Sequence, residues 1–247
     1  MTWRVGTVTA VRDETTTART LVLDVPGWPG HAAGQHVDVR LTAPDGYSAT
    51  RSYSIASASE GTAVELTVER FPDGEVSPYL SGEVAVGAQL ELRGPLGGWF
   101  VWRPDQEESV QLVAGGSGLV PLMAMLRTRQ RSGSRASMRL LYSVRDPSAV
   151  LYAAELAGLV DGAGDAAGPG VTFAWTRSAP SDSDRPPGRV DAALLAAAAW
   201  PAEVRPTCYV CGPTGFVERV ADLLVAAGHD ASRIRTERFG PTGGGRR

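Results

Sequence analysis

The spacing of apolar residues changes character near residue 104, and this change is the strongest constraint on how the chain can fold. Before it, apolar and polar residues alternate over segments of strand length, as expected for strands that bury one face. Residues 19–25, 36–41 and 64–68 are clear cases, and clusters of Gly, Pro and Asp separate them. We therefore predict that residues 1–104 form a six-stranded antiparallel β-barrel, with one short helical turn at residues 77–80.

Beyond a polar stretch at residues 104–108, short apolar segments alternate with longer segments of helical character. Strands are expected at residues 110–114, 138–142, 171–175, 207–210 and 234–237, and helices at residues 119–131, 151–159, 191–198 and 216–226. This order predicts an α/β domain over residues 105–247, with a parallel five-stranded sheet and helices on both faces. Residues 162–170 and 178–188 are interpreted as flexible loops. Ligands of such sheets bind beyond the carboxyl ends of the strands, so the loops that follow those ends are expected to form a site.

The composition excludes several classes of partner. A net charge of −3 gives no basic field that would attract nucleic acid or an anionic membrane. The amino terminus lacks a secretory pattern and no stretch reaches the roughly 18 apolar residues of a membrane span, so we expect a soluble cytoplasmic protein. The two cysteines, Cys208 and Cys211, cannot hold an iron–sulfur cluster alone, and we expect neither a metal site nor a disulfide. The oligomeric state stays open, and a monomer is compatible with the sequence.

A glycine-rich turn joins the first predicted strand of the second half to its helix. The segment runs Gly115-Gly116-Ser117-Gly118 and reaches Pro121 in the first helical turn, where a missing N–H costs little. Small residues at such a turn let backbone N–H groups approach a pyrophosphate at the positive end of the helix. The segment departs from the dinucleotide fingerprint at its third glycine, and a purely structural glycine turn is the alternative.

A second motif, Cys211-Gly212-Pro213, follows a later strand of the same predicted sheet. It therefore opens onto the same sheet edge as the glycine turn. A small, polarisable side chain at Cys211 can lie against a nicotinamide ring without blocking it. The alternative is that Cys211 is a small hydrophobic residue of the core.

In the barrel half, alternation along Arg51-Ser52-Tyr53-Ser54 places Arg51 and Tyr53 on one strand face, with Ile55, and the two serines on the other. An Arg beside a Tyr can hold a diphosphate while the phenol ring covers an aromatic heterocycle. A solvated, exposed strand is the alternative.

Taken in order, these motifs resemble the ferredoxin–NADP reductase family of flavin reductases, over nearly the whole chain. Arg51-Ser52-Tyr53-Ser54 is similar to the family's flavin motif Arg-x-Tyr-Ser. Gly74-Glu75-Val76-Ser77 is similar to its flavin-diphosphate turn, and Gly94-Pro95-Leu96-Gly97 is similar to its interdomain Gly-Pro segment. Gly115-Gly116-Ser117-Gly118 and Cys211-Gly212-Pro213 are similar to its two nicotinamide-dinucleotide motifs. Each match is weak alone, but their shared order makes coincidence improbable.

The resemblance implies roles for individual residues. Arg51 would bind the flavin diphosphate, Tyr53 would stack on one isoalloxazine face, and Ser54 would hydrogen-bond near the reactive ring nitrogen. The resemblance also places Ser52, Val68, Glu69, Gly74, Glu75, Val76 and Ser77 in the flavin site. It places Gly116, Ser117, Gly118, Pro121, Gly212 and Pro213 in the nucleotide site.

Near the carboxyl terminus, Glu237-Arg238-Phe239 is similar to the family's pattern of a carboxylate, one residue and an aromatic. The resemblance implies that Cys211 lies near the hydride-bearing carbon, that Glu237 relays a proton, and that Phe239 covers the other flavin face. Plant-type members stop at a Tyr, whereas this chain continues through residues 240–247. A solvated Glu237 near the terminus is the alternative to a relay.

The choice between nicotinamide cofactors depends on whether a ribose 2′-phosphate is bound. Ser143 and Arg145 follow the second strand of the predicted sheet and Arg177 follows the third, where forked phosphate contacts can form. We therefore expect NADPH in preference to NADH. Pairing of Arg145 with Asp146 or Glu155 on the surface is the alternative.

These expectations define a function. We predict an NAD(P)H-dependent flavoprotein reductase that uses FAD, with FMN as the alternative flavin, and passes single electrons to a separate protein, a ferredoxin or an oxygenase component. One rival is a flavin-bearing electron-transfer subunit of a larger complex that does not use free NAD(P)H. A second is a flavin-free dehydrogenase with an unrelated first domain.

Overall fold

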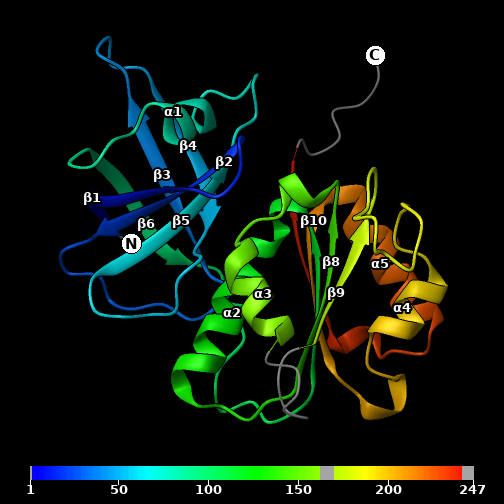
Figure 1. Ribbon diagram of the computed structural model, residues 1–247. Helices are drawn as coiled ribbons and strands as arrows, with labels where there is room; N and C mark the ends of the chain where they lie inside the picture. Colours follow the sequence, from blue (N-terminus) through cyan, green and yellow to red (C-terminus); the bar gives the residue numbers. More distant parts are fainter. Residues whose placement is uncertain (1, 162–169, 241–247) are drawn as a thin grey trace, which may run out of the picture. The chain divides into compact units, whose positions relative to one another are not determined.

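The computed structural model describes residues 2–161 and 170–240, so most of the loop predicted at 162–170, and the tail after Gly240, lie outside the described residues. The described chain divides into two compact units (Figure 1). Unit 1 contains Met1–Arg103 and Met123–Ser132, and unit 2 contains Pro104–Leu122 and Gly133–Arg247. We keep the domain limits 1–104 and 105–247 as a proposal. No helix in the described parts combines the length and apolar character that a membrane crossing requires.

Unit 1 is built on an antiparallel sheet whose order, within the described residues, is β4-β3-β6-β1-β2-β5. Its elements are β1 (Trp3–Asp13), β2 (Ala18–Asp24), β3 (His36–Thr42), β4 (Ser48–Ser54), β5 (Ala63–Glu69), α1 (Ser77–Gly82) and β6 (Gln89–Leu96). An antiparallel bridge between Ile55, the residue after β4, and Leu66 of β5 connects the two ends of this order. The prediction of a six-stranded antiparallel barrel with a short helix near residue 77 is confirmed.

The core of the barrel follows from the alternation in the sequence. Val37 and Val39 of β3 are fully buried, whereas Arg40, the next residue of the strand, is partly exposed. On β4, Tyr53 lies opposite Val37 and Arg51 opposite Val39. Residues directly opposite each other share a face of the sheet, so Arg51 and Tyr53 project on the side of the core. Ser52 and Ser54 consequently project on the outer side.

Unit 2 contains a parallel sheet whose order, within the described residues, is β11-β10-β7-β8-β9. Its elements are β7 (Val110–Gly115), η1 (Gly116–Gly118), α2 (Leu119–Ser132), β8 (Met138–Val144), η2 (Pro147–Ala149), α3 (Ala153–Asp161), β9 (Gly170–Trp175), α4 (Ala192–Ala198), η4 (Ala202–Val204), β10 (Thr207–Pro213), α5 (Thr214–Ala226), η5 (Ala231–Arg233) and β11 (Ile234–Phe239), with the last residues of α2 grouped in unit 1. Figure 1 shows α3 on one face of the sheet and α4 and α5 on the other. The predicted parallel five-stranded sheet is confirmed.

The register of this sheet aligns the predicted ligand-binding positions at its carboxyl edge. Cys211 of β10 lies opposite Glu237 of β11 on one side and Ala114 of β7 on the other. One residue further along, Gly115 of β7 lies opposite Ser143 of β8. Three predicted motifs that are distant in the sequence therefore reach the same edge of the sheet.

Candidate functional site

The Arg51 side chain joins the two predicted flavin-binding segments of the barrel. Its Nη2 donates to Glu75 Oε2 at 2.6 Å, and its Nη1 donates to the carbonyl oxygen of Thr50 at 2.8 Å. The other carboxylate oxygen of Glu75 accepts from the Tyr47 hydroxyl at 2.9 Å. About half of each ionic side chain in the Arg51–Glu75 pair is exposed, so the pair is a weak one that an anion can displace.

Tyr53 sits deeper than Arg51 and packs against the barrel core. Burial raises the pKa of its hydroxyl to about 12, against the opposing effect of the Arg51 charge, so the phenol is neutral. Ser54 ends β4 opposite His36 and is partly buried. A neutral aromatic ring beside a surface guanidinium is an arrangement that can hold a heterocycle with an attached phosphate.

The turn from Gly74 to Ser77 closes on itself. The Gly74 N–H donates to the Phe71 carbonyl at 2.9 Å, and the buried Ser77 hydroxyl accepts from the Phe71 N–H at 3.1 Å. A Cβ on Gly74 would lie 2.9 Å from Ser77 Oγ and 3.1 Å from the Phe71 carbonyl oxygen. A side chain at position 74 would therefore crowd this turn, while Val76 is buried and Glu75 is exposed beside Arg51.

A hollow of about 590 Å³ adjoins this region, between the β3–β4 hairpin, α1 and β6. Tyr47 and Tyr79 line it together with Glu75, the partner of Arg51. Val68 and Glu69, the other predicted flavin residues, lie at the end of β5, where Val68 is buried in the core and Glu69 is half-buried. Sequence reasoning missed Tyr47 and Tyr79, because neither belongs to a motif of fixed spacing.

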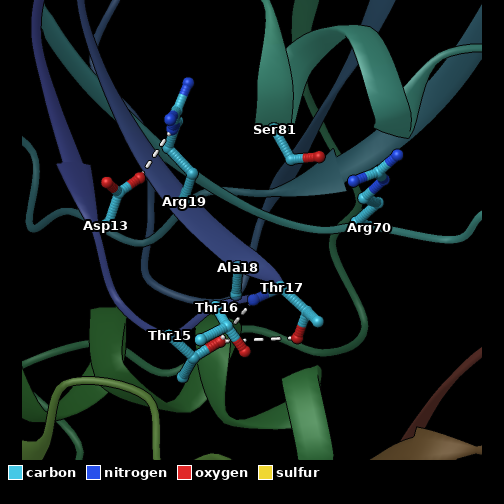
Figure 2. A pocket seen from close by; sticks show the side chains of 8 residues that line it. All are labelled: Asp13, Thr15, Thr16, Thr17, Ala18, Arg19, Arg70 and Ser81. Carbon is cyan, nitrogen blue, oxygen red and sulfur yellow. Dashed lines mark hydrogen bonds and ion pairs between the residues drawn. The ribbon is translucent and has the colours of Figure 1, made fainter.

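A second hollow, of about 370 Å³, lies beside the β1–β2 hairpin (Figure 2). Arg19 donates to Asp13 at 2.8 Å on one side of it, and Arg70 and Ser81 stand on the other. Its lining, drawn from the described residues, includes none of the predicted flavin-binding residues. The first hollow is therefore the one that adjoins the predicted flavin site.

In unit 2, the glycine turn and the cysteine motif pack directly on each other. A Cβ on Gly118 would lie 2.2 Å from the Cys211 carbonyl oxygen, and one on Gly115 would lie 2.7 Å from the Phe216 ring. Gly116 has a φ of +54°, in the left-handed region that favours glycine, and Ser117 is half-buried. Pro121 is buried in the first turn of α2. The turn thus has a packing requirement for glycine as well as the predicted phosphate role.

Cys211 is almost fully buried at the end of β10. Burial raises the pKa of its thiol well above the usual value, the charge of Glu237 adds to this, and a hydrogen bond involving the Gly212 backbone opposes it. The thiol is therefore neutral and unreactive as a nucleophile. Phe239 lies opposite Pro213, and both Glu237 and Phe239 are partly exposed at this edge of the sheet.

The two predicted phosphate-binding arginines are neighbours. Arg145 follows β8 and Arg177 follows β9, and the Arg177 N–H donates to the Arg145 carbonyl oxygen at 2.9 Å. Both residues lie at the surface, and Ser143 is buried just before Arg145. Asp146, the alternative partner of Arg145, accepts from the Ser148 hydroxyl and N–H. The structure therefore brings Arg145 and Arg177 together at the carboxyl edge of the sheet.

A barrel with an Arg–Tyr strand and a parallel sheet with a glycine-lined edge together define a class: oxidoreductases that bind a flavin and a pyridine nucleotide. Residues 7–101 match the oxidoreductase FAD-binding domain, and residues 112–222 match the oxidoreductase NAD-binding domain. The chain belongs to the ferredoxin–NADP reductase family, as its motifs predicted.

Individual relatives agree with this assignment. The chain is 30% identical to a flavohemoprotein of Vibrio cholerae over 97% of its own length and 60% of the relative. It is 30% identical to a glycine betaine monooxygenase reductase subunit of Pseudomonas aeruginosa, over 85% of the chain and 56% of the relative. The crystal structure of the FAD/NAD-binding domain of a nitric oxide dioxygenase from Vibrio cholerae matches with a TM-score of 0.84 and 28% identity, over 96% of this chain and 99% of that one. The chain thus spans a little over half the length of these curated relatives.

Proposed function

We propose that this protein is an NAD(P)H-dependent flavoprotein reductase, which accepts hydride from a pyridine nucleotide and delivers single electrons to a separate acceptor protein. The observation that carries the proposal is the packing of the Cys211 backbone on Gly118, in a chain whose other unit matches an FAD-binding domain. Bound FAD would supply the conversion of a two-electron donor into a one-electron donor. The protein residues bind and orient the reactants.

The barrel residues fit the diphosphate and the ring of a flavin. Arg51 exchanges its exposed contact with Glu75 for a charge-assisted bond to the flavin diphosphate, and Tyr53 covers one face of the ring. Ser54 donates a hydrogen bond at the ring edge. The hollow lined by Tyr47 and Tyr79 takes the adenine of FAD, a group that FMN lacks. These contacts support FAD as the flavin.

The flavin assignment has a direct test. We expect purified protein to be yellow and its extracted flavin to be FAD by chromatography. Replacing both Tyr47 and Tyr79 with Ala should weaken binding of FAD but leave that of FMN unchanged. Equal losses for both flavins would contradict the adenine assignment, and colourless protein that takes up no added flavin would contradict the flavin site.

In unit 2, the glycine turn admits the nucleotide pyrophosphate, and the neutral Cys211 borders the nicotinamide. Glu237, one strand away, relays a proton between the site and solvent. Arg145 and Arg177 grip the 2′-phosphate that distinguishes NADPH from NADH. We therefore propose NADPH as the preferred donor.

Replacing Arg145 with Ala tests this preference. The change should raise the KM for NADPH about tenfold, the effect of losing roughly 1.4 kcal/mol, and leave the KM for NADH within twofold. Arg177→Ala should behave in the same way, because the backbones of the two residues are hydrogen-bonded. Equal effects on both nucleotides would refute the phosphate role.

We assign the acceptor to an oxygenase component or a ferredoxin, in keeping with the reductase subunit among the relatives. The rival, a flavin-bearing subunit that does not use free NAD(P)H, has no need for a glycine turn packed this closely on Cys211. Reoxidation of the NADPH-reduced protein by a purified ferredoxin, in one-electron steps, tests the acceptor class. Absence of electron transfer to any ferredoxin or oxygenase component would contradict it.

A further inference from the structure

Asp38 is a buried carboxylate on the outer face of the barrel. Only 7% of the residue is exposed, although it carries a charge and lies in the middle of β3. Its Oδ1 accepts from the Ser52 hydroxyl at 2.7 Å. Its Oδ2 accepts from Arg93 Nη2 at 2.6 Å and from Arg93 Nε at 3.2 Å. One side chain thus joins the strand on each side of β3, because Ser52 belongs to β4 and Arg93 to β6.

The hydrogen bonds compensate for the burial of this charge. Burial alone would raise the pKa of Asp38, but the bonds from Ser52 and Arg93 and the charges of Arg93 and His36 lower it overall. Asp38 is therefore ionised at neutral pH. A charged acceptor makes a stronger bond to a hydroxyl than a neutral one does, so the position of Ser52 is held firmly.

Ser52 is placed where its orientation matters to the flavin site. It lies between Arg51 and Tyr53 in the chain, and successive residues of a strand project to opposite faces. The register of β4 on β3 sets the faces on which Arg51 and Tyr53 project, and a bond that holds Ser52 on the outer face reinforces that orientation. Ser52 occupies the position that the motif Arg-x-Tyr-Ser leaves open, so the motif itself does not account for this contact.

We propose that Asp38 is a positioning residue of the flavin site, which acts through Ser52 to hold Arg51 and Tyr53 in the orientation that binds flavin. The inference rests on the proposed function and deepens it, because it attributes part of the affinity for flavin to a residue that does not touch the flavin. Arg93 anchors the opposite oxygen of Asp38 and keeps the carboxylate from turning away from β4.

The pair Arg19–Asp13 is a control outside the flavin site. Arg19 of β2 donates to Asp13 of β1 at 2.8 Å. The pair joins neighbouring strands of the same barrel, as Asp38–Arg93 does, but it lines the second hollow and not the one assigned to the adenine. Among the residues that the structure describes, no side-chain bond connects either member to β4. Loss of the Asp13 charge reports the general effect of breaking an ion pair in the barrel.

The experiment compares the release of FAD from four variant holoproteins: Asp38→Asn, Ser52→Ala, Ser52→Thr and Asp13→Asn. Release is followed by the rise of flavin fluorescence after dilution, together with the fluorescence lifetime of the flavin that stays bound, which reports stacking on Tyr53. We expect Asp38→Asn and Ser52→Ala to speed release about tenfold and to lengthen the lifetime. Ser52→Thr, which keeps the hydroxyl, and Asp13→Asn should stay within twofold of the parent protein.

Several results would overturn the proposal. Release of FAD from Ser52→Ala at the parent rate would show that the Ser52–Asp38 bond does not position β4. This result decides the question even if Asp38→Asn does not fold. Equal acceleration in Asp13→Asn would show only a general loss of barrel stability. If the parent protein binds no flavin, the proposed function fails first, and that outcome is distinct from parent-like variants of a yellow protein.

Discussion

Replacing Gly118 with Ala is the sharpest perturbation that the structure offers. The added methyl carbon would lie 2.2 Å from the Cys211 carbonyl oxygen, 2.4 Å from the Cys211 carbonyl carbon and 2.7 Å from the Gly212 backbone nitrogen. Ordinary contacts begin near 3.4 Å, so the two segments must separate by about 1.2 Å. The atoms in the way belong to the backbone of β10, which is paired with β7 and β11 on its two sides and cannot move alone.

The expected cost is that of overpacking a well-filled site, about 1–3 kcal/mol. For a chain of this size each kcal/mol lowers the Tm by roughly 2–4 °C, which gives a fall of roughly 2–12 °C. The same separation displaces Cys211 and the glycine turn, so the affinity for NADPH should fall as well. Thermal unfolding followed by circular dichroism, and titration with NADPH, measure the two effects.

Gly158→Ala provides the control for this prediction. Gly158 lies in α3 and is exposed, and a methyl group added there would have no atom of the described residues within 4 Å. The same chemical change should there be neutral or stabilise by about 0.5–1 kcal/mol, because Ala favours helix over Gly. If Gly118→Ala unfolds at the same temperature as Gly158→Ala and binds NADPH as the parent does, the close packing of the two motifs is refuted.

Two further predictions follow from burial and charge. The pKa of Asp38 is lower in the folded barrel than in the unfolded chain, so its stabilising contribution is complete above the unfolded value, about 3.9, and is lost as the pH falls through the folded value. Acid unfolding of Asp38→Asn should therefore depend less steeply on pH below about 4 than that of the parent, and parallel curves would contradict the assignment. Burial raises the pKa of Cys208 to about 12 and that of Cys211 well above its usual value, so a thiol reagent at a pH of about 8 should label both only after unfolding. Rapid labelling of the native protein would show that one of these thiols is accessible.

The fold was largely predictable because periodicity is a local property of the chain. Alternation over residues 36–41 predicted β3, which spans His36–Thr42, and the apolar segment at 207–210 predicted β10. The predicted ends of the strands and helices were less accurate. β10 continues to Pro213 because β11 pairs with it as far as Phe239, a contact from a distant segment. The helix expected from residue 151 begins at Ala153, after Tyr152 adopts a φ of +53° that is incompatible with a helix.

The site could be predicted only where its residues belong to a local sequence motif. The Arg51 strand and the Cys211 motif each carry a local pattern, and the order of the motifs indicated the family. The bond from Ser52 to Asp38 and the contact of Gly118 with Cys211 depend on strand register and turn packing, which no short window of sequence encodes. An aspartate within the alternating strand at 36–41 was the only local signal for the first of these contacts.

The central claim is that one chain takes hydride from a pyridine nucleotide and holds the flavin that receives it. Anaerobic mixing of the purified yellow protein with NADPH in a stopped-flow spectrometer tests it most directly. We predict that the visible absorption of the bound flavin bleaches, and that NADH reduces it less efficiently. A flavin that stays oxidised at millimolar NADPH would contradict the account.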